Sequence, residues 1–288
     1  MARRLDLHPW DDLPGTAARG RAWALVHGDC VQALERLPPH SVDVAFADPP
    51  YMLSNGGTTC QSGRRASVDK GAWDASRGLA HDHAFQTRWL EAVRRVLKPS
   101  GTIWVSGTQH VIFSIGFAMQ ELGYHLLNTV TWYKPNASPN LACRFFTHST
   151  ELLLWASPSR ARPLAHRFNY QAMKAVNRGK QMRDLWDIWE APAAGDEQVI
   201  WSIPTPGPRE KVHGRHPTQK PLALLERVLA ASAAAGDLVL DPFSGSGTTG
   251  VAALRAGCRF LGLERDAEYV ELAARRLRAE AAPVAPAH

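Results

Sequence analysis

Short apolar runs alternate with amphipathic segments along most of this chain, and this alternation constrains its fold more than any other feature. The run from Val42 to Ala47 is apolar enough for a buried strand, whereas the apolar residues between positions 82 and 97 recur at helical spacing. The same patterns predict strands at 22–26, 102–106, 124–133, 149–156, 238–240 and 259–263, and helices at 31–37, 110–122, 222–234, 248–256 and 267–281. This order predicts an α/β fold with a doubly wound, mostly parallel sheet and helices on both faces. In such sheets ligands bind beyond the carboxyl ends of the strands, where the winding reverses.

Residues 157–215 interrupt the alternation. The segment is rich in Arg, Lys, His, Trp and Pro and has no clear period, so we expect an insertion or a small second domain. Residues 52–80 are a second irregular stretch, rich in Gly, Ser and Arg, and a loop of this length inside a compact domain is usually functional or disordered. A chain of 288 residues is long enough for one large domain with such an insertion.

Charge and cysteine content narrow the class of protein. The formal net charge of +6 permits a polyanionic partner, and nucleic acid is the first candidate. The four cysteines are scattered without a C-x-x-C pair, which argues against structural zinc, so no metal is expected. Because no run is long enough to span a membrane and the first residues lack the apolar stretch of a signal peptide, we expect a cytoplasmic protein without a membrane partner.

A glycine-rich loop, DPFSGSGTTG at 241–250, follows a predicted strand and opens a predicted helix. Its glycines match G-x-G-x-x-G, which lets a backbone turn tightly and approach a ligand. Asp241 ends the strand, where a carboxylate would repel the pyrophosphate of a dinucleotide but attract a cationic group. S-adenosylmethionine carries a sulfonium and an amine, and Glu264 ends the next strand, where an acid can reach a ribose hydroxyl. The plain alternative is a glycine-rich turn with two solvated acids.

The strand at 42–47 ends in Asp48-Pro49-Pro50-Tyr51, an unusually stiff connection. Together with the glycine loop, this D-P-P-Y element resembles the motifs of the DNA amino-methyltransferases, which methylate an exocyclic base nitrogen. Here D-P-P-Y precedes the glycine loop and the basic segment lies between them, an order similar to the permuted, beta-class arrangement. The stretch HPTQKP at 216–221 is also typical of that class, and the resemblance covers about residues 22–280.

Three further stretches resemble a narrower group: SVDKGAWD at 67–74, PNLACRFFTHSTELLLWA at 139–156 and GKQMRDLW at 179–186. They are similar to the second adenine methylase of DpnII-type restriction systems, enzymes of GATC sites that accept single-stranded DNA. The resemblance implies a permuted, Rossmann-like methyltransferase fold. It divides the chain into a flexible arm (1–20), a catalytic half (21–156), a target-recognition insertion (157–215), a cofactor-binding half (216–281) and a tail (282–288).

The resemblance assigns the chemistry to Asp48, Pro49, Pro50 and Tyr51. The amino nitrogen of adenine is a poor nucleophile because its lone pair is delocalised into the ring. The Asp48 carboxylate and the Pro49 carbonyl are implied to accept its protons, and the Pro-Pro step holds that carbonyl in place. Tyr51 is implied to stack on the flipped-out base, which offsets part of the cost of flipping. The plain alternative for Tyr51 is an ordinary core aromatic.

The resemblance also implies which residues bind S-adenosylmethionine. Asp29 is implied to bind the adenine amino group, although it could equally cap the helix that follows it. Thr218 and Lys220 are candidates near the carboxylate of the cofactor, and Glu264 is implied to bind the ribose. The residues implied around the methionine part are Asp241, Phe243, Ser244, Gly245 and Gly247.

DNA, double- or single-stranded, is the implied partner. We expect the basic loop after Tyr51 to close over flipped DNA, and the basic insertion to contact phosphates and bases. For each basic residue, a solvated face is the alternative. The candidate DNA contacts are Arg64, Arg65, Lys70, Arg178, Lys180 and Arg183. A homodimer and a cognate restriction endonuclease are further candidate partners.

The predicted activity is therefore transfer of a methyl group from S-adenosylmethionine to N6 of a flipped-out adenine. The nearest alternative is methylation of cytosine N4, where Ser more often stands in the place of Asp48. RNA and protein methyltransferases usually carry the glycine loop first, which argues against them. A nicotinamide-dependent oxidoreductase would leave D-P-P-Y and the basic insertion unexplained. A DNA-binding protein without catalysis would have no use for the cofactor residues.

Overall fold

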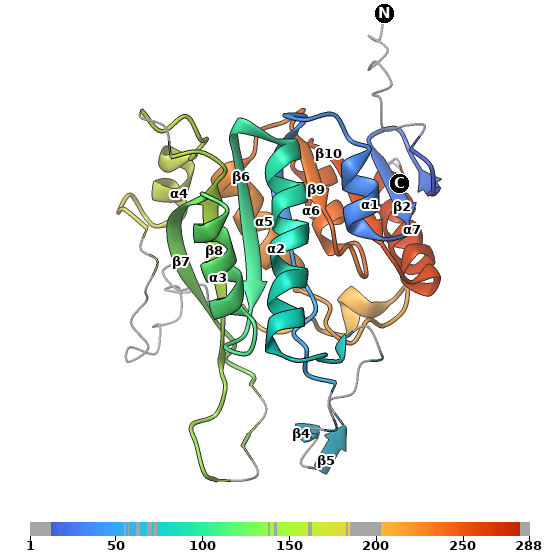
Figure 1. Cartoon of the computed structure of the whole chain (residues 1–288), viewed down its shortest axis with the longest axis vertical. Coiled ribbons are helices and arrows are strands. Elements are labelled where there is room, and N and C mark those ends of the chain that lie inside the picture. The colour runs from blue at the N-terminus through green and yellow to red at the C-terminus, as the bar shows by residue number, and fades with distance from the viewer. Residues whose placement is uncertain are drawn as a thin grey trace, which may run out of the picture.

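An eight-stranded sheet crosses the molecule in the order β1-β2-β10-β9-β3-β6-β8-β7, and β4 and β5 form a separate hairpin (Figure 1). The computed structural model describes residues 13–54, 56, 58–61, 64–67, 71, 74–137, 139–140, 143–160, 163–182, 184 and 203–282, with only the backbone path for 58–61 and 64–67.

The strands are β1 Thr16–Arg19, β2 Trp23–His27, β3 Val42–Ala47, β4 Thr58–Gln61, β5 Arg64–Ser67, β6 Leu97–Gly107, β7 His125–Tyr133, β8 Thr150–Ser157, β9 Leu238–Asp241 and β10 Arg259–Glu264. The helices are α1 Cys30–Glu35, α2 Leu79–Val96, α3 Ile112–Glu121, α4 Tyr170–Val176, α5 Leu222–Ser232, α6 Thr248–Arg255 and α7 Ala267–Ala281, with a 3₁₀ turn, η2, at Pro208–Lys211.

The centre of the sheet is parallel and its edges are antiparallel. Strands β2, β10, β9, β3 and β6 run in one direction, whereas β8 opposes β6, β7 opposes β8, and β1 opposes β2. The chain leaves β9 through α6 toward β10 and leaves β3 through α2 toward β6, in opposite directions along the sheet. The winding therefore reverses between β9 and β3, and the predicted doubly wound, mostly parallel fold is confirmed.

Two apolar layers enclose the sheet. Helices α1, α2 and α3 cover one face and α5, α6 and α7 cover the other (Figure 1). Along β3, Ala45 and Ala47 pack in the first layer while Val44 and Phe46 pack in the second, as the alternation of a strand requires. No helix within the described ranges carries an apolar stretch long enough to cross a membrane.

Two regions differ from the sequence-based expectations. Thr16–Arg19 falls in the expected flexible arm but forms β1, which pairs with β2, and Leu13 beside it is buried. The expectation of an arm is wrong for these four residues because β2 satisfies their backbone hydrogen bonds. The rest of the arm, residues 1–12, lies outside the described residues. The irregular stretch 52–80 contains the β4–β5 hairpin, which projects from one end of the molecule (Figure 1).

The described part of 157–215 packs against the second helical layer. Asn169 precedes α4, and its side-chain amide donates to the carbonyls of Ala230 and Ala233 at the end of α5. Met173 of α4 is buried in the same layer. These contacts are made at the C-terminal end of α5, whereas Lys220 of the cavity precedes the N-terminal end of the same helix. The described part of the insertion therefore rests on a helix rather than forming a separate core.

Candidate active site

A cavity of about 610 Å³ opens where the winding of the sheet reverses, beyond the carboxyl ends of β3, β9 and β10. Its volume lies within the range of about 300–1,000 Å³ that is typical of small-molecule sites. The predicted site residues that line it are Asp29, Asp48, Pro49, Pro50, Tyr51, Thr218, Lys220, Asp241, Phe243, Ser244, Gly245 and Glu264. The structure thus brings the D-P-P-Y element and the glycine loop together from positions almost 200 residues apart in the chain.

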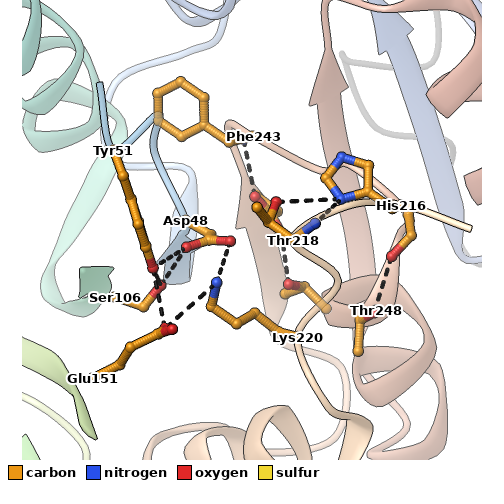
Figure 2. A network of polar contacts seen from close by, with 12 residues as sticks. Asp48, Tyr51, Ser106, Glu151, His216, Thr218, Lys220, Phe243 and Thr248 are labelled. Atoms are coloured by element: carbon orange, nitrogen blue, oxygen red, sulfur yellow. Dashed lines mark hydrogen bonds and ion pairs between the residues drawn. The ribbon is translucent and has the colours of Figure 1, made fainter. Parts of the chain in front are cut away.

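Asp48 lies at the centre of a polar network on one wall of this cavity (Figure 2). Its Oδ1 accepts hydrogen bonds from Ser106 Oγ at 2.6 Å and from the Tyr51 hydroxyl at 2.8 Å. Its Oδ2 pairs with Lys220 Nζ at 2.5 Å. Lys220 was expected near the cofactor carboxylate, whereas here it is the ion-pair partner of Asp48.

A second buried ion pair supports the first. Glu151, at the start of β8, pairs with Lys134 Nζ at 3.0 Å and lies 3.7 Å from Lys220 Nζ. The Tyr51 hydroxyl is also within hydrogen-bond distance of Glu151, at 3.2 Å. Burial opposes ionisation of Glu151, but the two ammonium groups outweigh it and hold the Glu151 pKa below its ordinary value. Two carboxylates thus face two ammonium groups beside Tyr51.

These charges also set the protonation of Tyr51 and Lys220. Burial raises the pKa of Tyr51 well above its ordinary value, and the neighbouring carboxylates raise it further, so the phenol stays neutral and can donate its proton. Burial lowers the pKa of Lys220, but Asp48 and Glu151 outweigh this and leave it above the ordinary value. Lys220 therefore carries a positive charge next to the Asp48 carboxylate.

Asp74 holds the backbone of the D-P-P-Y loop. Its carboxylate is completely buried; Oδ1 accepts from the backbone N–H groups of Tyr51 (2.8 Å) and Met52 (2.9 Å). Oδ2 accepts from Leu53 N at 3.2 Å and from Ser54 Oγ at 3.0 Å. One side chain thus satisfies four donors that follow Pro50, and it fixes the path of the chain next to the cavity.

Asp241 ends β9, the strand next to β3, and its carboxylate accepts two hydrogen bonds. Its Oδ1 accepts from Phe243 N at 2.9 Å and its Oδ2 accepts from Thr249 Oγ1 at 2.6 Å. Burial raises the pKa of Asp241 to about 7, although both hydrogen bonds act in the opposite direction. Glu264 accepts from Gly245 N at 2.7 Å and from Asp266 N at 2.8 Å, and burial raises its pKa as well.

The glycines of the loop have different structural roles. Gly245 has φ +50° and lines the cavity, where an added Cβ would lie 3.2 Å from the His216 ring. Gly247 caps α6 in the left-handed region, and its Cβ would meet Ala273 at 2.9 Å. Gly247 was expected around the cofactor but does not line the cavity, because it faces α7.

The acids and the orphaned polar atoms of the cavity fit S-adenosylmethionine. Ser244 Oγ is buried without a hydrogen-bond partner in the described part of the chain, although it lines the cavity. Asp29 caps α1 through Oδ1 alone, at 3.0 Å from Val31 N, and its Oδ2 has no protein donor among the described residues. The cap and the ligand-binding interpretation of Asp29 are therefore compatible. The acids Asp29, Asp241 and Glu264 line a partly apolar cavity, and such a site suits a ligand with cationic groups and hydroxyls.

Among the predicted DNA contacts whose side chains the structure describes, Arg178 and Lys180 do not line the cavity. Arg64 and Arg65 belong to β5 of the projecting hairpin, where the backbone alone is described. Arg178 and Lys180 follow α4, a helix that lies away from the hairpin in Figure 1. Lys70 and Arg183 lie outside the described residues.

Several site residues escaped the sequence-based prediction. Ser106 ends an apolar strand, and Glu151 opens another, so a polar residue at the edge of each apolar run was the available signal. Asp74 and Glu151 both lie in the stretches that resembled the narrower methylase group. His216, whose ring packs edge-on against Tyr269 at 4.2 Å between centroids, lies in the HPTQKP stretch.

Comparisons with known proteins agree with this geometry. Residues 42–275 match the family model N6_N4_Mtase, described as DNA methylase. The chain is 47% identical over 258 residues to the Type II methyltransferase M2.DpnII of Streptococcus pneumoniae, which covers 89% of this chain and 90% of that relative. Among solved structures it is similar to the M1.HpyAVI–SAM complex, with a TM-score of 0.61 and 24% identity over 88% of this chain and 98% of that one. It is also similar to the cytosine-N4-specific PvuII DNA methyltransferase, with a TM-score of 0.63 and 18% identity over 88% and 86% of the two chains.

Proposed function

This chain belongs to the DNA methylase family, and on that premise we propose that it methylates N6 of a flipped-out adenine. It is a methyltransferase that uses S-adenosylmethionine, and DNA is its substrate. The observation that carries the proposal is the meeting of Asp48 and Tyr51 with the glycine loop in one cavity. An amine acceptor and a cofactor-binding loop thus face the same space.

In this mechanism Asp48 and the Pro49 carbonyl accept hydrogen bonds from the adenine amino group, so that the nitrogen lone pair leaves conjugation with the ring. S-adenosylmethionine supplies an electrophilic methyl group when bound. Oδ1 of Asp48 already accepts two hydrogen bonds, whereas Oδ2 accepts one, from Lys220. Because a carboxylate oxygen has two lone pairs, Oδ2 keeps one for the amino group. The ion pair holds the Asp48 carboxylate in place, and a fixed acceptor needs little reorganisation.

Tyr51 supplies the proposed stacking surface. Its ring is 7% exposed and lines the cavity, while its hydroxyl is anchored on Asp48. Anchoring at the hydroxyl leaves the face of the ring as the part of this residue that a base can contact. Stacking of one base on one aromatic ring contributes about 1–3 kcal/mol, against a flipping cost of a few kcal/mol.

Several finer assignments are part of the proposal. The choice of adenine rests on Asp48, since cytosine-N4 methyltransferases more often have Ser at that place. We propose residues 157–215 as the target-recognition insertion between the catalytic half, 21–156, and the cofactor-binding half, 216–281. A cognate restriction endonuclease and a homodimer are proposed from the same resemblance, and a cytoplasmic location is proposed from the sequence patterns described above. The predicted basic contacts belong to this set: Arg64, Arg65, Lys70, Arg178, Lys180 and Arg183.

The test is to incubate the protein with methyl-labelled S-adenosylmethionine and DNA, digest the DNA and identify the modified nucleoside. We expect N6-methyladenine. The matched control is Asp48→Ala, which should retain cofactor binding and lose nearly all turnover because the acceptor is gone. Recovery of N4-methylcytosine would overturn the adenine assignment, and substantial activity of Asp48→Ala would show that the acceptor lies elsewhere.

A further inference from the structure

The loop between β7 and β8 starts and ends next to the polar network that contains Tyr51 and Asp48. Lys134 N donates to Ser149 O at 2.7 Å, which closes the base of the loop. Lys134 Nζ also pairs with Glu151, whose other oxygen lies 3.2 Å from the Tyr51 hydroxyl. The loop therefore projects from the residues that position the predicted stacking ring.

The tip of this loop presents aromatic rings to water. Phe146 is 95% exposed and Phe145 is 58% exposed. Asn140 Nδ2 donates to the carbonyl of Phe145 at 2.7 Å, which folds the tip back on itself, and the Phe145 ring packs against His148 with 5.2 Å between centroids. Phe145 is thus held by its neighbours, whereas the Phe146 ring is displayed on a structured turn.

Charge and position suit a nucleic-acid partner for this tip. Positions 134–149 contain Lys134 and the exposed Arg144 but no Asp or Glu. In Figure 1 the loop and the β4–β5 hairpin project from the same end of the molecule. The bases of the two projections both touch Tyr51, one through Asp74 and the other through Glu151. Both projections therefore lie near DNA that delivers a base to Tyr51.

The tip can reach the base stack. Phe146 precedes Thr150, the first residue of β8, by four positions, so their Cα atoms are at most about 14 Å apart. The major groove is about 8.5 Å deep. A tether of this length is therefore compatible with insertion of the Phe146 ring into a bound duplex.

We infer that Phe146 enters the duplex and stacks in the space that the flipped base leaves. This inference rests on the proposed function, since a vacated space exists only where a base leaves the stack. Apolar side chains inserted between bases compensate for lost stacking in other DNA-binding proteins. Phe146 would act on the DNA from which the base departs, and Tyr51 would act on the base itself.

The test compares Phe146→Ala with the wild type on three DNAs that carry the same methylation site: a duplex, the single strand, and a duplex in which the target base faces an abasic position. Phe117→Ala is the matched control, since Phe117 is 56% exposed on α3, where its ring lies 5.6 Å from that of His83. Phe146→Trp tests whether any large aromatic ring suffices. Equal cofactor affinity and equal Tm establish that each variant is folded.

We expect Phe146→Ala to lower kcat/KM on the duplex by about tenfold to a hundredfold. The loss should shrink to about threefold or less on the other two DNAs, because neither holds a fully stacked, paired target. Phe146→Trp and Phe117→Ala should stay close to the wild type. An equal loss on all three DNAs, or no loss on the duplex, would overturn the inference. A wild type that methylates none of the three would instead refute the proposed function.

Discussion

At the scale of single residues, the ion pair of Asp48 with Lys220 joins two side chains that are largely buried. The two groups lie 2.5 Å apart, and Glu151 with Lys134 extends the pair into a network of four charges. Removing one partner of a buried pair leaves an uncompensated charge, which costs about 3–5 kcal/mol. The acceptor geometry of Asp48 therefore depends on residues from three other parts of the chain.

Asp74 gives the sharpest test of positioning by a residue outside the reaction. Asp74→Asn places an amide N–H₂ against donors that now face a carboxylate oxygen, so the loop after Pro50 should shift. A displacement of about 1 Å can cost about a hundredfold in rate, and we expect kcat to fall at least about tenfold while cofactor affinity stays within about twofold. Steady-state kinetics and equilibrium binding measure the two effects.

Asp237→Asn is the matched control for that substitution. Asp237 also accepts a backbone N–H, from Ala234, but it does not line the active-site cavity. It should change stability and leave kcat unaltered. If Asp74→Asn and Asp237→Asn affect kcat equally, Asp74 has no positioning role.

Cofactor binding should depend on pH through Asp241. Its pKa is raised to about 7, and the charged groups that contribute to its surroundings are Asp48, Glu264 and Lys220. A cationic ligand favours the ionised carboxylate, so affinity should fall as pH drops below 7, by up to about tenfold per pH unit. The pKa of Asp241 is 3.8 in the unfolded chain and about 7 in the folded one, so ionisation of Asp241 lowers the stability of the fold as pH rises from 3.8 to about 7. Binding of a cationic ligand offsets this effect.

The measurement is the dissociation constant of S-adenosylmethionine between pH 6 and pH 8. Asp241→Asn should bind more weakly at pH 8 and show a flatter profile, since the titrating group is absent. A wild-type affinity that does not change over this range would refute the assignment.

At the scale of elements, the helix that follows the glycine loop is fixed by close packing. Gly250 lies in α6, where an added Cβ would come within 2.6 Å of the Phe260 ring and 2.7 Å of Leu277. Gly250, the last glycine of the G-x-G-x-x-G pattern, thus allows α6 to pack closely against β10 and α7. It does not line the cavity. Gly262 of β10 similarly leaves room for Ser244 Oγ.

Gly250→Ala should therefore destabilise the protein despite the better helix propensity of alanine. Overpacking costs about 1–3 kcal/mol, and the propensity gain returns about 1 kcal/mol at most. We expect Tm to fall by several degrees, as measured by differential scanning calorimetry. Gly207→Ala is the control, since Gly207 has φ −80° and open space around its Cβ position. Equal Tm values for the two variants would contradict this packing role.

At the scale of the whole molecule, the sheet acts as a platform with two projections beside the cavity. The β4–β5 hairpin leaves the D-P-P-Y loop and returns at Asp74, where Ser54 N donates to Asp74 O at 3.0 Å. Its base is therefore closed independently of its tip. A change in the hairpin should leave the cavity intact.

Replacing residues 58–67 by a Gly-Ser-Gly link tests this separation. Methylation of DNA should fall about a hundredfold or more if the basic hairpin holds the substrate, because phosphate contacts supply much of the affinity for DNA. Affinity for S-adenosylmethionine should remain within about twofold. Calorimetric titration and methyl incorporation measure the two properties, and loss of both would count against a separate role for the hairpin.

Local patterns were enough to predict most of the fold and much of the site. The apolar runs of β3, β9 and β10 and the stripe of α2 are recorded in residues that are close in sequence. The order of D-P-P-Y and the glycine loop was a sufficient signal for the family. Strand β1 escaped prediction because four residues that pair with one neighbour have no distinctive pattern.

Only the tertiary structure decided which charges meet. Lys220 pairs with Asp48, from which it is separated by 172 positions in the sequence. Tyr51 contacts Asp74, which lies 23 positions away, and Glu151, which lies 100 positions away. Strand and helix periods are local properties, whereas such contacts depend on strand order, register and loop paths that no local pattern records. The sequence by itself therefore determined the architecture and the residue types of the site. The folded chain determined which carboxylate is free to accept, which one is held by backbone N–H groups, and which loops stand beside the cavity.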